Sequence, residues 1–134
     1  MNTLKGTITE INSDEHFSVV AIDVSGVTFK SVIIETPDTV PFLRPGAAVK
    51  IMFKETEVSI AKNFSGMISM QNKMSCTIRK IKKGKLLSRV DLDFKTEKIV
   101  SIITTGAVEQ LNLNGNDEVL ALIKTNEITL APNE

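Results

Sequence analysis

At Ile68-Ser69-Met70-Gln71-Asn72-Lys73 one copy of a repeated sequence ends and a second copy begins. When the sequence is compared with itself at an offset of 70 positions, the two halves align without a gap. The identical pairs extend over the whole repeat: Asn2/Asn72, Thr7/Thr77, Ile8/Ile78, Ile11/Ile81, Ser18/Ser88, Val20/Val90, Asp23/Asp93, Ser31/Ser101, Ile33/Ile103, Leu43/Leu113, Val49/Val119, Lys54/Lys124, Glu57/Glu127, Ala61/Ala131 and Asn63/Asn133. This match predicts a tandem duplication of one small domain, with unit 1 at residues 1–66 and unit 2 at residues 67–134.

The size and charge of the two units limit what they can do. Units this small are marginally stable alone, so we expect them to pack on each other or on further chains. The whole sequence has 16 basic and 16 acidic residues. Unit 1 has six basic against eight acidic residues, and unit 2 has ten against eight. This balance argues against a protein that binds polyanions, but it leaves room for a small anion near unit 2.

The sequence also favours one cellular compartment. Its single cysteine, Cys76, excludes an internal disulfide and is compatible with a reducing environment. The N-terminus lacks the basic start and apolar run of a signal peptide, and no apolar run is long enough to span a bilayer. We therefore expect a cytoplasmic protein without membrane insertion.

Both halves alternate between apolar and polar residues, as is typical of half-buried strands. The predicted strands are residues 4–9, 17–24, 27–34, 49–53 and 58–60 in unit 1, and 77–81, 86–94, 99–104, 119–123 and 127–130 in unit 2. Residues 37–46, with three prolines, predict a helical turn and loop, and residues 107–113 predict a short helix. This order is that of an OB-like Greek-key barrel. We therefore predict an all-β protein of two tandem OB-like five-stranded barrels, each with one short helix.

Three segments of unit 2 carry a resemblance to a known family. They are Ser69-Met70-Gln71-Asn72, Ile102-Ile103-Thr104, and the run from Val108-Glu109-Gln110-Leu111-Asn112-Leu113 to Asp117-Glu118-Val119-Leu120-Ala121-Leu122-Ile123-Lys124-Thr125. Together they resemble the Mop unit, also called the TOBE domain, of molybdate- and tungstate-binding proteins. Two such units in one short chain are similar to the tandem-Mop proteins. The resemblance implies OB-like barrels, symmetric oligomers, and oxyanion sites at interfaces between units.

The resemblance also implies a set of binding residues. The family uses a leading Ser-x-Arg-Asn motif, a Thr before the helix, and a Lys followed by a small or polar residue. These positions fall on Ser69, Gln71, Asn72, Thr104, Lys124 and Thr125. Molybdate is a tetrahedral dianion that offers only hydrogen-bond acceptors, so hydroxyl, amide and ammonium donors suit it.

This sequence departs from the family pattern at several positions. Gln71 stands where the family usually has Arg, which removes a charge and a bidentate donor. In unit 1 only Asn2 and Lys54 survive, because Ile34 replaces Thr104 and Glu55 replaces Thr125. The carboxylate of Glu55 repels a dianion unless it points away. We therefore expect unit 2 to contribute the better sites.

Three functions remain open from the sequence. The first is a non-enzymatic protein that binds molybdate or tungstate for buffering, storage or delivery, as a homo-oligomer with a trimer favoured and a dimer possible. The second is an accessory or regulatory module of a molybdate importer, docking onto a transporter ATPase. The third is a nucleic-acid-binding barrel using the run Arg79, Lys80, Lys82, Lys83 and Lys85. The third is the least favoured, because the chain has no Trp or Tyr for base stacking.

No pattern in the sequence indicates catalysis. There is no nucleophile–base pair, no motif of paired carboxylates and no Gly-rich phosphate loop. The single histidine, His16, has no second histidine or cysteine near it in the sequence to form a metal site. We therefore expect no enzymatic activity, no directly bound metal and no covalent cofactor.

Overall fold

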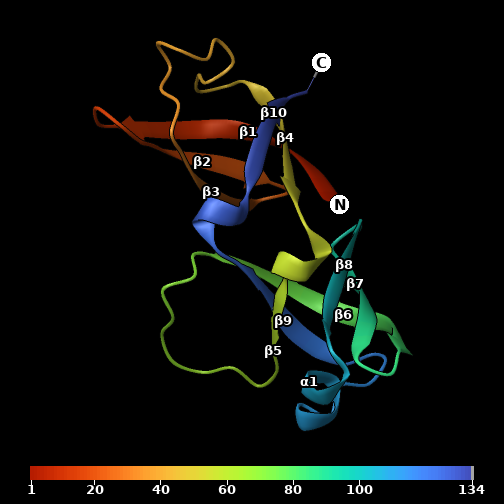
Figure 1. Cartoon of the computed structure of the whole chain (residues 1–134). Coiled ribbons are helices and arrows are strands. Elements are labelled where there is room, and N and C mark those ends of the chain that lie inside the picture. Colours follow the sequence, from red (N-terminus) through yellow and green to blue (C-terminus); the bar gives the residue numbers. More distant parts are fainter. Residues whose placement is uncertain (134) are drawn as a thin grey trace.

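The computed structural model describes residues 1–133 and consists mainly of strands (Figure 1). The strands are β1 (Asn2–Ser13), β2 (Ser18–Val24), β3 (Val27–Ile33), β4 (Ala48–Phe53), β5 (Ser59–Ala61), β6 (Asn72–Lys83), β7 (Leu87–Phe94), β8 (Glu97–Thr104), β9 (Glu118–Ile123) and β10 (Thr129–Pro132). The helical elements are α1 (Thr105–Gln110) and two single 3₁₀ turns, η1 (Glu55–Glu57) and η2 (Thr125–Glu127). The predicted all-β fold of two five-stranded units is confirmed.

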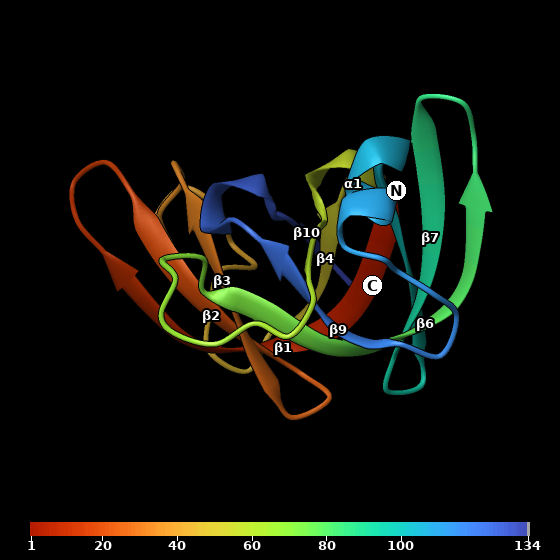
Figure 2. The same cartoon turned by 90° about the horizontal axis from the view of Figure 1, so that it is seen from below.

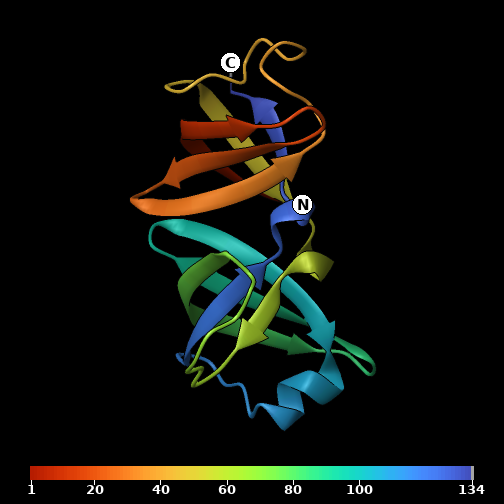
Figure 3. The same cartoon turned by 90° about the vertical axis from the view of Figure 1, so that its left-hand side faces the viewer.

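The two sheets exchange their outermost strands. One sheet has the order β10-β4-β1-β2-β3, and the other has the order β5-β9-β6-β7-β8. Each therefore takes four strands from one half of the sequence and the fifth from the other half (Figures 1 and 3). We expected residues 58–60 to close unit 1, and this prediction is wrong, because β5 pairs with β9. After η1 the chain thus passes from the first sheet to the second. After η2 it passes back, and β10 pairs with β4 in the first sheet.

Two buried asparagines hold the sheets together. The side chain of Asn72 accepts a hydrogen bond from the backbone N–H of Lys30 at 2.7 Å and donates one to the Lys30 carbonyl at 2.9 Å. Asn2 makes the same pair of bonds with Val100, at 2.9 and 2.8 Å. The offset of 70 that relates Asn2 to Asn72 also relates Lys30 to Val100. The contact is thus made twice, and each unit contributes one asparagine to the other.

The hydrophobic cores of the two units are continuous. The buried apolar residues form one cluster that includes Leu4, Ile22 and Ile51 from unit 1 and Met74 and Ile123 from unit 2. Phe29 of unit 1 and Phe94 of unit 2 meet edge to face, with ring centroids 6.2 Å apart. Sharing one core offsets the limited burial available to a unit of this size.

Unit 1 lacks the helix that was expected between its third and fourth strands. Residues 35–47 form turns instead, in which the N–H groups of Thr39 and Val40 both donate to the Thr36 carbonyl. The prolines at positions 37, 41 and 45 have no N–H to continue a helical ladder. Unit 2 has no proline in the corresponding segment and forms α1 there.

The duplication has kept one backbone conformation at the end of this segment. Gly46 has a φ of 90°, and its counterpart Asn116 has a φ of 73°. The N–H of Gly46 donates to the carbonyl of Ile8, and the N–H of Asn116 donates to the carbonyl of Ile78. Ile8 and Ile78 are themselves related by the offset of 70. Glycine and asparagine are the residues that adopt positive φ most readily. The left-handed position predicted from the sequence is therefore confirmed in both units.

Cys76 is buried, and we expect its thiol to be unreactive in the folded protein. Burial raises the pKa of the Cys76 thiol to about 12, because the thiolate loses its hydration. Alkylation by iodoacetamide at pH 8 should be at least about a hundredfold slower in the native protein than in urea. A Ser75→Cys variant, with its new thiol at an exposed position, serves as the control and should react rapidly without urea. Equal rates at the two positions would contradict this prediction.

Candidate functional site

Three of the predicted binding residues meet at the junction between the units. Ser69, Lys124 and Thr125 line a cavity of ≈ 180 Å³ together with Met70 and Asn126. Lys124 is exposed, and Thr125 is half-buried in the turn η2. The cavity therefore combines one ammonium group with two hydroxyls, an amide and no carboxylate.

The register of the second sheet brings these residues together. β6 and β9 are antiparallel, and Asn72 at the start of β6 lies opposite Ile123 at the end of β9. The residues before β6 and those after β9 must therefore lie side by side. η2 then turns the chain, with the N–H of Glu127 donating to the carbonyl of Lys124 at 3.1 Å.

Sequence reasoning missed Asn126 as a residue lining the cavity. The only available signal was its position directly after the Lys124-Thr125 pair, within the same turn. Its side-chain amide is a further donor that suits an acceptor-only ligand.

Asn72 and Gln71 do not line this cavity. Gln71 is exposed on the chain just before β6. Asn72 is fully buried, and its amide nitrogen and oxygen both bond to Lys30. With no exposed surface, Asn72 has a structural role in this chain, and it is not placed to donate to an anion in the cavity.

Thr104 lies at the opposite end of the second sheet. Thr104 on β8 pairs with Leu87 on β7, and Leu87 lies near Lys83, the last residue of β6. Lys124 instead follows Ile123, which pairs with Asn72, the first residue of this 12-residue strand. The Thr104 hydroxyl accepts a hydrogen bond from the N–H of Ala107 at 3.0 Å. Thr104 is the last residue of β8, directly before α1 (Figure 1). Within one chain the structure therefore does not bring Thr104 to Lys124.

The corresponding positions of unit 1 are already engaged. Asn2 is buried in its bonds to Val100. Glu55, next to the exposed Lys54, accepts a hydrogen bond from the N-terminal ammonium of Met1 at 2.8 Å. This bond holds the pKa of the Glu55 carboxyl below its usual range, so the group remains an anion. A carboxylate at this position disfavours a second anion beside Lys54.

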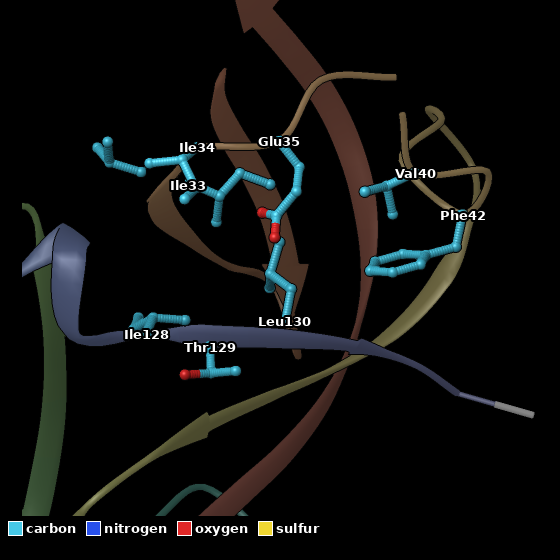
Figure 4. A pocket seen from close by; sticks show the side chains of 9 residues that line it. Ile33, Ile34, Glu35, Val40, Phe42, Ile128, Thr129 and Leu130 are labelled. Atoms are coloured by element: carbon cyan, nitrogen blue, oxygen red, sulfur yellow. The ribbon is translucent and has the colours of Figure 1, made fainter. Parts of the chain in front are cut away.

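A larger groove lies on the first sheet, between the loop that follows β3 and the strand β10. It has a volume of ≈ 370 Å³ and is lined by Val32, Ile33, Ile34, Glu35, Val40, Phe42, Ile128, Thr129 and Leu130. Figure 4 shows the carboxylate of Glu35 pointing among the apolar side chains of Ile33 and Leu130. With Glu35 as the one charged residue of its lining, this groove is unsuited to an oxyanion.

The chain is similar to several known proteins. Residues 68–130 match the family model of the TOBE domain. The structure is similar to that of the cytoplasmic molybdate-binding protein ModG with molybdate bound, with a TM-score of 0.92, 25% identity, and coverage of 98% of this chain and 96% of that one. The molybdenum import ATP-binding proteins ModC of Brucella abortus and Brucella suis are 28% identical over 112 residues, which is 83% of this chain. This chain spans 29% of the length of these curated relatives.

Two interlocked OB-like units, with a small cavity of donor groups at their junction, define a tandem-barrel protein with the architecture of a binding protein. Residues 68–130 match the TOBE domain, and the whole chain shares the fold of the molybdate-binding protein ModG. None of the helices in residues 1–133 has the length and apolar character needed to cross a bilayer.

Proposed function

We propose that this protein binds molybdate or tungstate in the cytoplasm and buffers, stores or delivers the anion, without enzymatic activity of its own. The observation that carries the proposal is the cavity in which Lys124, Ser69 and Thr125 lie together with no carboxylate. The similarity of nearly the whole chain to ModG, whose crystal structure contains molybdate, supports the same ligand class.

Each cavity residue has a role suited to a tetrahedral dianion. The ammonium of Lys124 offsets part of its charge, and the hydroxyls of Ser69 and Thr125 donate directed hydrogen bonds to its oxygens. One lysine leaves part of the dianion's charge unbalanced, and Gln71 supplies no charge where the family usually has Arg. Further donors must therefore come from elsewhere.

We infer that a second copy of the chain completes the site. Thr104 is exposed and lies at the opposite end of its own unit, so a neighbouring copy can present it to the cavity. A homo-oligomer supplies such neighbours by symmetry, with a trimer favoured and a dimer possible. In unit 1, Lys54 contributes less because the carboxylate of Glu55 lies beside it, and Asn2 contributes less because it is buried.

Calorimetric titration with molybdate, tungstate and sulfate tests the proposed function. We expect saturable heat for molybdate and tungstate at micromolar concentration or below, and weaker binding of sulfate. An absence of heat for all three anions at concentrations well above micromolar would overturn the proposal.

The second candidate function is an accessory or regulatory module of a molybdate importer. It is favoured by the 28% identity to the molybdenum import ATP-binding proteins over 83% of this chain. Retention of a transporter ATPase on the immobilised protein, combined with no binding of oxyanions, would favour this candidate over the first.

A further inference from the structure

The first hairpins of the two units are equivalent in sequence position but opposite in charge. We call residues 9–19, at the turn between β1 and β2, the acidic hairpin, and residues 79–89, at the turn between β6 and β7, the basic hairpin. The acidic hairpin contains Glu10, Asp14 and Glu15 and no Lys or Arg. The basic hairpin contains Arg79, Lys80, Lys82, Lys83, Lys85 and Arg89 and no Asp or Glu. After the duplication, the same surface has therefore acquired opposite signs in the two units.

Most of the positive charge on the basic hairpin is free to meet a partner. Arg79 and Arg89 are engaged within the chain, at 3.5 Å from Asp93 and 2.8 Å from Asp91. The four lysines of the hairpin are exposed, and none of them belongs to an ion pair among residues 1–133: Lys80, Lys82, Lys83 and Lys85. Four unpaired ammonium groups on one hairpin produce a strong local positive potential.

The negative charge of the acidic hairpin is fixed at its tip. The carboxylate of Asp14 accepts hydrogen bonds from the backbone N–H groups of His16 and Phe17, both at 2.8 Å. These bonds hold the pKa of Asp14 below its usual range, so it stays ionised. Glu10 and Glu15 are exposed beside it.

Each hairpin also exposes large apolar side chains. Phe17 and its counterpart Leu87 are 49% and 56% exposed, and Leu86 is 75% exposed. Ile34, which is 76% exposed, directly follows Ile33, and Ile33 pairs with the neighbour of Phe17 in β2. Apolar side chains surrounded by charges of one sign are typical of an interaction surface with a charged rim.

The two hairpins cannot meet within one molecule. Their tips lie on opposite sides of the chain in Figures 1 and 2. Two copies, however, can bring unlike hairpins together in a head-to-tail contact, and repetition of that contact gives a closed ring or an open filament.

We propose that the acidic hairpin of one copy docks against the basic hairpin of a second copy, with Phe17 and Leu87 at the centre of the contact. The contact sets unit 1 of one chain beside unit 2 of the next. This inference rests on the proposed homo-oligomer but not on binding of an oxyanion.

Charge reversal tests the contact by sedimentation velocity of the full chain without oxyanion. Lys82→Glu with Lys83→Glu, or Glu10→Lys with Glu15→Lys, should each weaken self-association at least tenfold, and high salt should weaken it in the wild type. The quadruple variant that carries all four changes should associate again, because it exchanges the two signs. Lys5→Glu with Lys95→Glu is the control for the lysine variant, since both lysines are exposed outside the hairpins and the change in net charge is the same.

Several outcomes would overturn this inference. These are a monomeric wild type, unchanged association of either double variant, and a quadruple variant that fails to associate while its circular dichroism shows a native fold. A monomer whose basic hairpin retains single-stranded oligonucleotide in a salt-sensitive way would assign the lysines to nucleic acid instead. If assembly follows the expected pattern but calorimetry detects no oxyanion binding, the docking contact stands and the proposed function fails.

Discussion

Replacing Asn72 by alanine is expected to lower the free energy of unfolding by about 2–4 kcal/mol, because two buried backbone groups lose their hydrogen-bond partner. In the native protein the Asn72 side chain bonds to the N–H and the carbonyl of Lys30. Alanine leaves these two groups without partners at a junction where Asn72 itself has no exposed surface. Each unsatisfied buried group costs about 1–3 kcal/mol.

Urea unfolding at fixed protein concentration measures this loss, and the chain offers two matched comparisons. Asn12→Ala changes an exposed asparagine at the end of β1, where we expect an effect within about 0.5 kcal/mol. Asn2→Ala removes the equivalent bonds to Val100 and should cost about as much as Asn72→Ala. If Asn72→Ala unfolds at the same urea concentration as Asn12→Ala, water can replace the side chain and the junction does not depend on it.

The parts of the fold that depend on local patterns were predictable from the sequence. The offset of 70 identified two units, and the alternation of apolar and polar residues located the strands. The pairing of Gly46 with Asn116 predicted a left-handed position that both units have. Each of these signals lies within a few residues or within the repeat itself.

The exchange of β5 and β10 was not predictable in this way. Alternation determines which face of a strand is buried, but not which sheet receives that strand. Residues 59–61 resemble residues 129–131, so either segment suits either sheet by pattern alone. The choice is made by the direction of the chain at η1 and η2, and no local signal in the sequence predicted that direction.

The candidate site was predictable only in part, for a related reason. The motif residues Ser69, Lys124 and Thr125 meet because they flank paired ends of β6 and β9. Asn72 belongs to the same motif, but its partner Lys30 lies 42 positions away in the other unit, and no local pattern connects them. Thr104 and Lys124 are both binding positions in the family, but they lie far apart within one chain. In the proposed oligomer, a neighbouring copy brings Thr104 to the cavity. A relation between copies has no counterpart in the pattern of a single sequence.

Lys124→Ala is expected to weaken the proposed binding of molybdate more than tenfold. Lys124 provides the one ammonium group among the residues that line the cavity, and the ligand is a dianion. A charge-assisted hydrogen bond contributes roughly twice as much as a neutral one, so its removal exceeds the loss of either hydroxyl. Because Lys124 is exposed and makes no ion pair within residues 1–133, the substitution should leave the stability of the fold nearly unchanged.

Lys54→Ala provides the matched comparison, because Lys54 occupies the same position in unit 1. We expect a smaller loss of affinity, since Glu55 remains an anion beside Lys54 where unit 2 has the hydroxyl of Thr125. Calorimetric titration of both variants against the wild type measures the difference. Equal losses would show that the two units contribute alike, and the carboxylate of Glu55 would then have to lie outside the site. A larger loss for Lys54→Ala would place the main site in unit 1, despite the ion pair between Glu55 and the N-terminal ammonium of Met1.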